Sequence, residues 1–471
     1  MNETQLTTSR VAVVESESVS NCFSEGIERL GGIDQFVKKG DTVFLKISLR
    51  LPYGYPTNSN FDLIERAIAI CKQAGAENIY VGSFPNQGVA VKLLDTSLGL
   101  EEYFERLGAE FVFLDNSDLF LDKSYDLEKL KEIKTQTIGE VEIGEDIVKI
   151  PKKIKEADKV IVLNQVNVAP LFKCELSLTN YHSILPGKNR YIEYKEDSQK
   201  EMVKHDIFRQ DFINNILNSY IIKKPVLAVN DLFYVLEGAG PLIYRDSRLK
   251  KTGLLIIGTD LISVDIITLR VLGFDALNND LISTAKERSL GPKEVSNIDV
   301  IGEDLGNISI EIEQCCSSLE EIKLQSLFVN SGEMCSGCFL KAYHLLNFMN
   351  SRMIKDLKYM PNHSFLVGLE PHEPNIKDKV ILFGDCAINS TDDYNFRTEI
   401  TKSLIKKKDK IKENKDILEL PGCPPNFLTC LNLISKYFKK RDLPNLNSYF
   451  KKLKTTKFNE LNEKLGEWEN I

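Results

Sequence analysis

Thr42-Val-Phe-Leu-Lys-Ile47 is a short run rich in β-branched and apolar residues, and together with the two runs that follow it decides the fold. Phe61 to Ala74 carries apolar side chains at helical spacing and ends at Gly75, a common stop signal for helices. Asn78 to Val81 then has the composition of a second strand. A strand, a helix and a strand in this order predict a largely parallel sheet with helices packed on it.

The same alternation continues along the chain. Further strands are predicted at Val11–Val14, Glu110–Leu114, Lys159–Leu163, Val226–Val229, Leu254–Ile257 and Ile298–Ile301, with a helix at Val264–Leu272. We therefore predict an α/β body over residues 1–328, and a division into two lobes at about residues 1–150 and 151–328 stays open. The polar, charge-rich stretch from Asn116 to Lys134 is expected to be a surface insertion.

A smaller α/β domain is predicted over residues 329–438. Strand-like runs at Lys379–Phe383 and Ile417–Leu420 each lead into a glycine and a cysteine, and an apolar helix is expected over Asn426–Phe438. Residues 439–471 are charged and are predicted to form a helical tail. The predicted fold class is thus α/β with mostly parallel sheet and flanking helices, plus a smaller cysteine-bearing α/β domain.

Composition excludes several classes of protein. The 471 residues include 60 Lys and Arg against 68 Asp and Glu, a net charge of −8 that disfavours broad binding to nucleic acid or anionic membranes. No apolar run approaches the roughly 18 residues of a membrane span, and the first residues lack a signal pattern. We therefore expect a cytoplasmic protein whose ten cysteines are metal ligands and buried thiols rather than disulfides.

Four cysteines in the last third of the chain carry most of the functional information. Cys335 and Cys338 form a C-x2-C pair, while Cys386 and Cys423 follow singly, each at a glycine-marked turn. Two cysteines spaced this way can hold one ion or cluster from a single turn, and Gly337 between them permits a tight backbone. Four thiolates gathered from turns suit an iron–sulfur cluster or zinc.

The turn Gly422-Cys423-Pro424-Pro425 is the more specific signal. It resembles the cluster-ligand turn of the small electron-transfer subunits of complex I and of nickel–iron hydrogenases. The helix expected after it would point the positive end of its dipole at the thiolate. We expect a [4Fe–4S] cluster on Cys335, Cys338, Cys386 and Cys423. A structural zinc, or no metal, stays open, and Cys430 is the reserve ligand.

A second group of polar residues lies in the central segment. Lys173 could hold an anion, and the histidines and aspartates nearby could bind a metal or move protons. We predict Lys173, His205 and Asp231 as catalytic residues, and His182, His205 and Asp260 as an alternative metal site. Asp260 could instead only cap the helix that follows it.

Several stretches of this chain resemble one family. Gly40 to Lys46, Asn230-Asp231, Glu237-Gly-Ala-Gly-Pro241 and Gly258-Thr-Asp260 are similar to the DUF362 family, a broad prokaryotic family of uncharacterised proteins. The resemblance covers roughly residues 10–305, and the four-cysteine block resembles the cluster-bearing extension of one branch. Many members carry, or lie beside, iron–sulfur cysteine motifs, so the resemblance implies such a cluster here.

Three functions follow as hypotheses. The first is an iron–sulfur protein with a redox or electron-transfer role on an unknown substrate, acting as an oxidoreductase or with a redox partner protein. The second is a non-enzymatic accessory or metal-binding protein with a structural cluster or zinc. The third is a metal-dependent, non-redox enzyme that uses the central histidines and aspartates.

Overall fold

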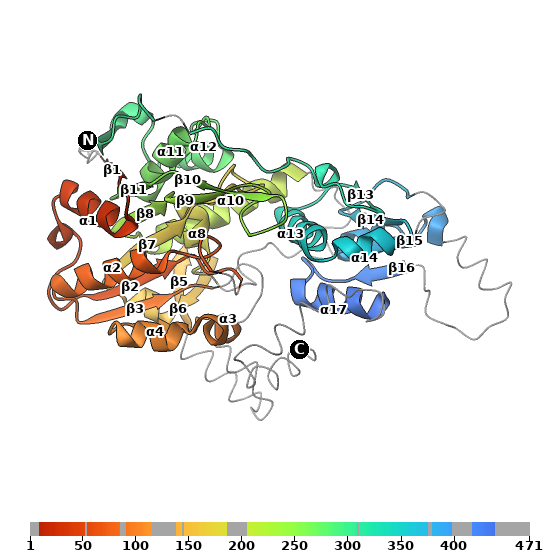
Figure 1. The fold of residues 1–471 in the computed structure, drawn as a ribbon, viewed down its shortest axis with the longest axis horizontal. Helices are drawn as coiled ribbons and strands as arrows, with labels where there is room; N and C mark the ends of the chain where they lie inside the picture. The colour runs from red at the N-terminus through yellow and green to blue at the C-terminus, as the bar shows by residue number, and fades with distance from the viewer. Residues whose placement is uncertain are drawn as a thin grey trace. The chain divides into compact units, whose positions relative to one another are not determined.

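A computed structural model describes residues 9–51, 54–84, 91–114, 138–143, 146–185, 205–308, 310–374, 379–397 and 417–438 (Figure 1). The chain forms two units. The first comprises residues 1–190, 213–243 and 247–315, and the second comprises residues 191–212, 244–246 and 316–471. The predicted fold class is confirmed, with a mostly parallel main sheet and a smaller parallel sheet toward the C-terminus. The expected surface insertion and the expected helical tail lie outside the described residues.

The first unit is built on an eight-stranded sheet with the order β12-β1-β11-β8-β7-β2-β3-β4. Its strands are β1 (Ser9–Glu15), β2 (Thr42–Ile47), β3 (Asn78–Gly82), β4 (Glu110–Val112), β7 (Lys159–Gln165), β8 (Leu227–Asp231), β11 (Leu254–Gly258) and β12 (Ile298–Gly302). Every pair is parallel except the two that β11 makes with β1 and β8. Strands from both sides of residue 150 therefore share one sheet.

Two antiparallel hairpins and a set of helices surround this sheet. The hairpins are β5 (Ile138–Ile143) with β6 (Asp146–Pro151) and β9 (Tyr234–Gly238) with β10 (Ser247–Lys251). The helices are α1 (Val19–Arg29), α2 (Phe61–Gln73), α3 (Val91–Leu98), α4 (Leu100–Arg106), α7 (Lys152–Glu156), α8 (Ser177–His182), α10 (His205–Ile222), α11 (Leu261–Val271) and α12 (Asp280–Glu287). Helix α2 ends as expected, because Gly75 has a φ of +85° that other residues rarely adopt.

Helices cover both faces of the main sheet. Gly26 of α1 lies against Ile257, so close that a Cβ on the glycine would come 2.4 Å from the Ile257 Cδ1 atom. The next residue along β11, Gly258, lies in the same way against Val264 of α11. Neighbouring residues of a strand point to opposite faces, so α1 and α11 pack on opposite sides. This explains why the strand residues from Val11 to Val14 are fully buried.

The second unit contains a four-stranded, fully parallel sheet with the order β13-β14-β15-β16. Its strands are β13 (Leu327–Ser331), β14 (His363–Val367), β15 (Lys379–Phe383) and β16 (Ile417–Leu420), and its helices are α13 (Ser336–Arg352), α14 (Ile354–Tyr359), α15 (Asp385–Ser390) and α17 (Phe427–Tyr437). Leu366, Val380, Leu382 and Phe396 form a core. Across the described parts of both units, no helix combines the length and the apolar character needed to cross a membrane.

The stretch from Glu237 to Pro241 contains Gly240, a position where the packing leaves no room for a side chain. A Cβ on Gly240 would come 2.4 Å from the Val168 carbonyl oxygen and 2.9 Å from the Val168 Cγ2 atom. The neighbour is a backbone atom, so the chain itself would have to shift.

We therefore expect Gly240→Ala to lower the free energy of unfolding by about 1–3 kcal/mol. Gly54→Ala is the control, because nothing lies within 4 Å of a Cβ there and the expected change is within about 0.5 kcal/mol. Denaturant unfolding of both variants measures the difference. Equal midpoints would contradict this account of the turn.

Candidate functional site

The carboxyl edge of the four-stranded sheet carries the four cysteines. Cys335 follows β13, Cys386 follows β15 and Cys423 follows β16. All four strands are parallel, so these three strand ends meet at one edge. Cys338 lies in the first turn of α13, directly after Cys335. The prediction that the two single cysteines lie just past strand ends is confirmed.

The C-x2-C pair has a different backbone from the one expected. Cys335 is the N-cap of α13 with an extended backbone (φ −76°, ψ 162°), and Gly337 lies inside the first helical turn. The expected tight glycine turn is therefore wrong, because Ser336 to Cys338 already continue into a long helix. A hydrogen bond from the Cys338 thiol, with backbone N–H groups of Cys338 and Gly337, lowers the pKa of Cys335 to about 6.

The four cysteines lie close enough for the charge on one thiol to shift the pKa of another. The hydrogen bond to Cys335 raises the pKa of Cys338, and burial and the charges of Cys335, Cys386 and Cys423 add to it. Burial raises the pKa of Cys386 to about 12, with further contributions from Cys423 and Cys335. A Cβ on Gly384 would come 3.3 Å from the Cys338 Sγ atom. The loops after β15 and β16 and the start of α13 therefore converge.

The donor set suits a soft metal centre. Within the described ranges, no three His, Cys, Asp or Glu side chains stand close enough together to hold a metal ion as they are. The chemistry of the four thiols, gathered at one edge beside a helix N-terminus, nevertheless fits an iron–sulfur cluster or zinc. Cys430 lies in the first turn of α17, where it is 2% exposed and burial raises its pKa to about 12. It belongs to the packed interior of the unit.

The first unit has its own polar edge. In the order β4-β3-β2-β7-β8 the chain reverses its direction across the sheet between β2 and β7, the point where ligands bind in open α/β sheets. Lys46, Ser48 and Arg50 lie at alternate positions there and are at most 2% exposed. The Lys46 Nζ atom donates to Asn180 Oδ1 at 2.7 Å and to Ser83 Oγ at 3.0 Å.

Arg50 forms a buried ion pair. Its Nη2 atom lies 2.6 Å from Glu175 Oε2, and the two side chains are 2% and 16% exposed. The Arg50 Nη1 atom also donates to the carbonyl oxygen of Thr57. Removing one partner of such a pair leaves a buried charge without compensation, so both residues hold the edge together.

A chain of amides links the strands to the helices above them. Asn164 Nδ2 donates to Asn230 Oδ1 at 2.8 Å, and Asn230 Nδ2 donates to Asp265 Oδ1 at 2.9 Å. Asp265 also accepts from the backbone N–H groups of Ser177 at 2.7 Å and Leu178 at 3.0 Å. It thereby anchors the start of α8 to α11, although burial still raises its pKa to about 6.

Asp231, at the end of β8, is only partly satisfied by hydrogen bonds. It is fully buried, and its Oδ1 atom accepts from the Phe233 N–H at 2.8 Å and from the Tyr55 hydroxyl at 3.5 Å. Its Oδ2 atom has no hydrogen-bond partner among the described residues, and the same holds for the Oε1 atom of its strand neighbour Gln165. Burial raises the pKa of Asp231 to about 7.

The loop after β2 covers this edge. The Tyr55 hydroxyl accepts from the Tyr234 N–H at 2.9 Å, and Asn167 Nδ2 donates to the Pro56 carbonyl oxygen at 2.7 Å. Both bonds tie the loop to residues that follow β7 and β8. The loop therefore places Tyr55 beside the buried Asp231.

The other predicted site residues lie elsewhere or serve the fold. Lys173 is exposed, with a φ of +70°, and its Nζ atom donates to Gln314 Oε1 at 3.1 Å. Asp260 caps α11 by accepting from the Ser263 N–H at 2.8 Å, which starts this helix three residues before the predicted Val264. His182 ends α8 and is buried. His205 begins α10, and its side chain lies outside the described part of the chain.

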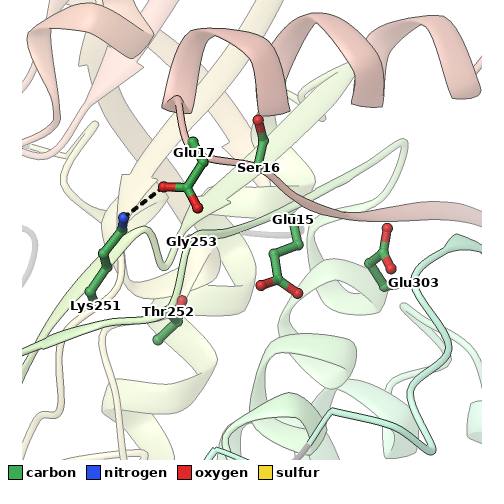
Figure 2. Close-up of a pocket in the computed structure, with 7 residues that line it drawn as sticks. All are labelled: Glu15, Ser16, Glu17, Lys251, Thr252, Gly253 and Glu303. Atoms are coloured by element: carbon green, nitrogen blue, oxygen red, sulfur yellow. Dashed lines mark hydrogen bonds and ion pairs between the residues drawn. The ribbon is translucent and has the colours of Figure 1, made fainter.

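A separate, open pocket of about 490 Å³ lies at the ends of β1 and β12 (Figure 2). Glu15, Ser16, Glu17, Lys251, Thr252, Gly253 and Glu303 line it. Glu17 and Lys251 form an ion pair at 3.1 Å, whereas Glu15 and Glu303 point apart in Figure 2. It contains none of the residues that the sequence predicts as functional.

Residues 43–270 match the family model described as domain of unknown function (DUF362). This part of the chain is similar to that family. The match spans β2 to α11 and so includes the whole polar edge from Lys46 to Asp265, whereas the four cysteines lie beyond it. No curated protein matches the chain. The match therefore covers this polar edge but assigns it no activity.

Much of the polar edge escaped the sequence prediction. Asp231 was predicted as a catalytic residue and Lys46 only as a point of resemblance, whereas Arg50, Tyr55 and Gln165 were not predicted. A signal was present, because Lys46, Ser48 and Arg50 are polar residues at alternate positions where the apolar run of β2 ends.

The raised pKa of Asp231 predicts a pH dependence of stability. Its folded value is about 7 against an ordinary 3.8, so the folded protein binds this proton more tightly than the unfolded chain. The stability that the protonated carboxyl contributes is complete below about pH 4 and is lost as the pH rises to 7. We expect Asp231→Asn, which cannot ionise, to gain roughly 2–4 kcal/mol relative to the wild type between pH 4 and 8. Denaturant unfolding across this range measures the gap, and parallel curves for the two proteins would refute the assignment.

Proposed function

We propose that this protein binds a [4Fe–4S] cluster through Cys335, Cys338, Cys386 and Cys423 and uses it in a redox or electron-transfer role in the cytoplasm. The observation that carries the proposal is the convergence of four thiols at the carboxyl edge of one parallel sheet. Such a cluster, when bound, supplies one-electron chemistry. Electrons would come from, or go to, a redox partner protein.

The residues around the thiols support this role. The backbone N–H groups at the start of α13 stabilise negative charge on Cys335, as a cluster ligand requires. Pro424 and Pro425 follow Cys423 without adding backbone donors, and Pro425 is buried. Cys338 is 3% exposed, so its sulfur is shielded from water and oxidants.

The proposed substrate site lies in the region that matches the DUF362 family model. Asp231 has a pKa near neutral pH, so it can both hold and release a proton there. Its Oδ1 atom accepts two hydrogen bonds, and the proton would therefore reside on Oδ2. Reduction of an organic substrate consumes protons as well as electrons, and Asp231 is the group we propose to provide them. Lys173 and His205 stay predictions.

Two alternative functions differ from this redox role in the group that the thiols bind or in its purpose. An accessory protein with a structural cluster or zinc would use the same four cysteines. A metal-dependent, non-redox enzyme would need Asp260 as a ligand, and that carboxylate already accepts from Ser263 and from the Tyr220 hydroxyl at 2.6 Å. No observation favours this third function.

Metal analysis of protein purified without oxygen tests the proposal. We expect about four irons and four sulfides per chain and a visible spectrum that bleaches with dithionite. Cys423→Ala is expected to lose the iron, because it removes a ligand. Cys430→Ala is the matched control, and we expect it to keep the iron because Cys430 lies in the core.

The other outcomes are equally clear. About one zinc per chain without iron would remove the redox role. Iron that resists reduction would favour the structural alternative. Equal iron loss in the Cys423 and Cys430 variants would contradict the ligand assignment.

A further inference from the structure

Asp385, the first residue of α15, ties the start of that helix, which carries Cys386, to the loop that carries Cys423. Its backbone N–H donates to the Gly422 carbonyl oxygen at 3.2 Å, and its Oδ1 atom accepts from the Gly422 N–H at 2.7 Å. Gly384 adds a bond from its N–H to the Leu420 carbonyl oxygen at 2.9 Å. The ladder between β15 and β16 is thus extended past both strands, up to the residues that adjoin Cys386 and Cys423.

The backbone at Gly384 and Gly422 leaves little room for a side chain or for another conformation. Gly384 and Gly422 have φ values of +89° and +128°, which side-chain-bearing residues rarely adopt. A Cβ on Gly384 would meet Cys338 Sγ at 3.3 Å, and one on Gly422 would meet Pro425 Cα at 3.0 Å. Gly384 therefore brings the backbone close to the Cys338 sulfur, and Gly422 packs against Pro425 in the turn that carries Cys423. The hydrogen bond of the Asp385 carboxylate joins these two parts of the backbone.

The carboxylate also brings a negative charge to the site. It accepts a hydrogen bond from Gly422, the residue before Cys423, and Asp385 itself is the residue before Cys386. A centre held by four thiolates gains one more negative charge when it takes up an electron. A fixed carboxylate beside it opposes that gain and lowers the reduction potential.

We propose that Asp385 is a positioning residue with two separable effects. Its hydrogen bond holds the start of α15, which carries Cys386, and the Cys423 loop in place for the cluster, and its charge lowers the reduction potential of that cluster. This inference rests on the proposed function, because it requires that the four cysteines hold an iron–sulfur cluster. The protein would thereby lose the cluster more slowly, and the reduced cluster would be a stronger reductant.

Two substitutions separate these effects. Asp385→Asn keeps an Oδ1 atom that can accept from the Gly422 N–H but removes the charge. Asp385→Ala removes both the acceptor and the charge. Asp392→Asn is the control, because Asp392 belongs to the same unit, its side chain is 74% exposed and it pairs with Arg397.

Two measurements on the full chain, purified without oxygen, test the proposal. The first is the rate at which the visible absorbance decays in the presence of an iron chelator. We expect Asp385→Ala to lose iron roughly tenfold faster than the wild type, and Asp385→Asn to stay within about twofold of it. The second is a dye-mediated titration in which dithionite supplies one electron per cluster. We expect a more positive midpoint for Asp385→Asn and no change for Asp392→Asn.

Each failure has a distinct meaning. If Asp385→Ala keeps its iron as long as the wild type, the hydrogen bond does not position the ligands. If Asp385→Asn titrates with the wild-type midpoint, the charge does not set the potential, and this test stands even where the alanine variant fails to fold. A wild-type chain without iron would instead remove the proposed function itself, a result that comes before either variant is made.

Discussion

Parallel pairing of strands is the constraint on which both candidate sites depend. In a parallel sheet every strand ends at the same edge, so residues far apart in sequence meet there. In the second unit this brings Cys335, Cys386 and Cys423 together from three strands. In the first unit it brings Arg50 beside Glu175 and places Asp231 beside Gln165. If β15 ran in the opposite direction, its end would carry Cys386 to the far edge and no four-thiol centre could form.

The polar edge of the first unit is costly to fold, and this cost differs between its carboxylates. Asp265 accepts hydrogen bonds from two backbone N–H groups and an amide, which offset much of its desolvation. Asp231 is equally buried, yet its Oδ2 atom has no described partner. An unsatisfied buried polar atom costs roughly 1–3 kcal/mol, which an ordinary core position would avoid with an apolar residue. This difference is why we propose Asp231, rather than Asp265, as the group that provides a proton.

The sequence predicted where strands and helices lie better than it predicted how the strands pair. Strands such as β2 and β15 were predicted because their apolar runs are bounded by turn residues, a purely local signal. The antiparallel direction of β11 was not predicted, since it is set by pairing with β1 and β8 and not by its own composition. The link from Asp385 to Gly422 was missed for a related reason. Its acceptor is a side chain but its donor is a backbone N–H, and a backbone donor leaves no trace in the sequence.

The four thiols are carried on short tethers from regular elements, and this bears on what they can do. Only Gly384 and Asp385 separate β15 from Cys386, and only Pro421 and Gly422 separate β16 from Cys423. The remaining pair sits on the first turn of α13, a helix of 17 residues. Ligands held by strand ends and a helix start, rather than by long loops, move little when the charge between them changes. A centre of this kind can gain and lose an electron without rebuilding its surroundings, which is why the arrangement suits electron transfer at least as well as a structural role.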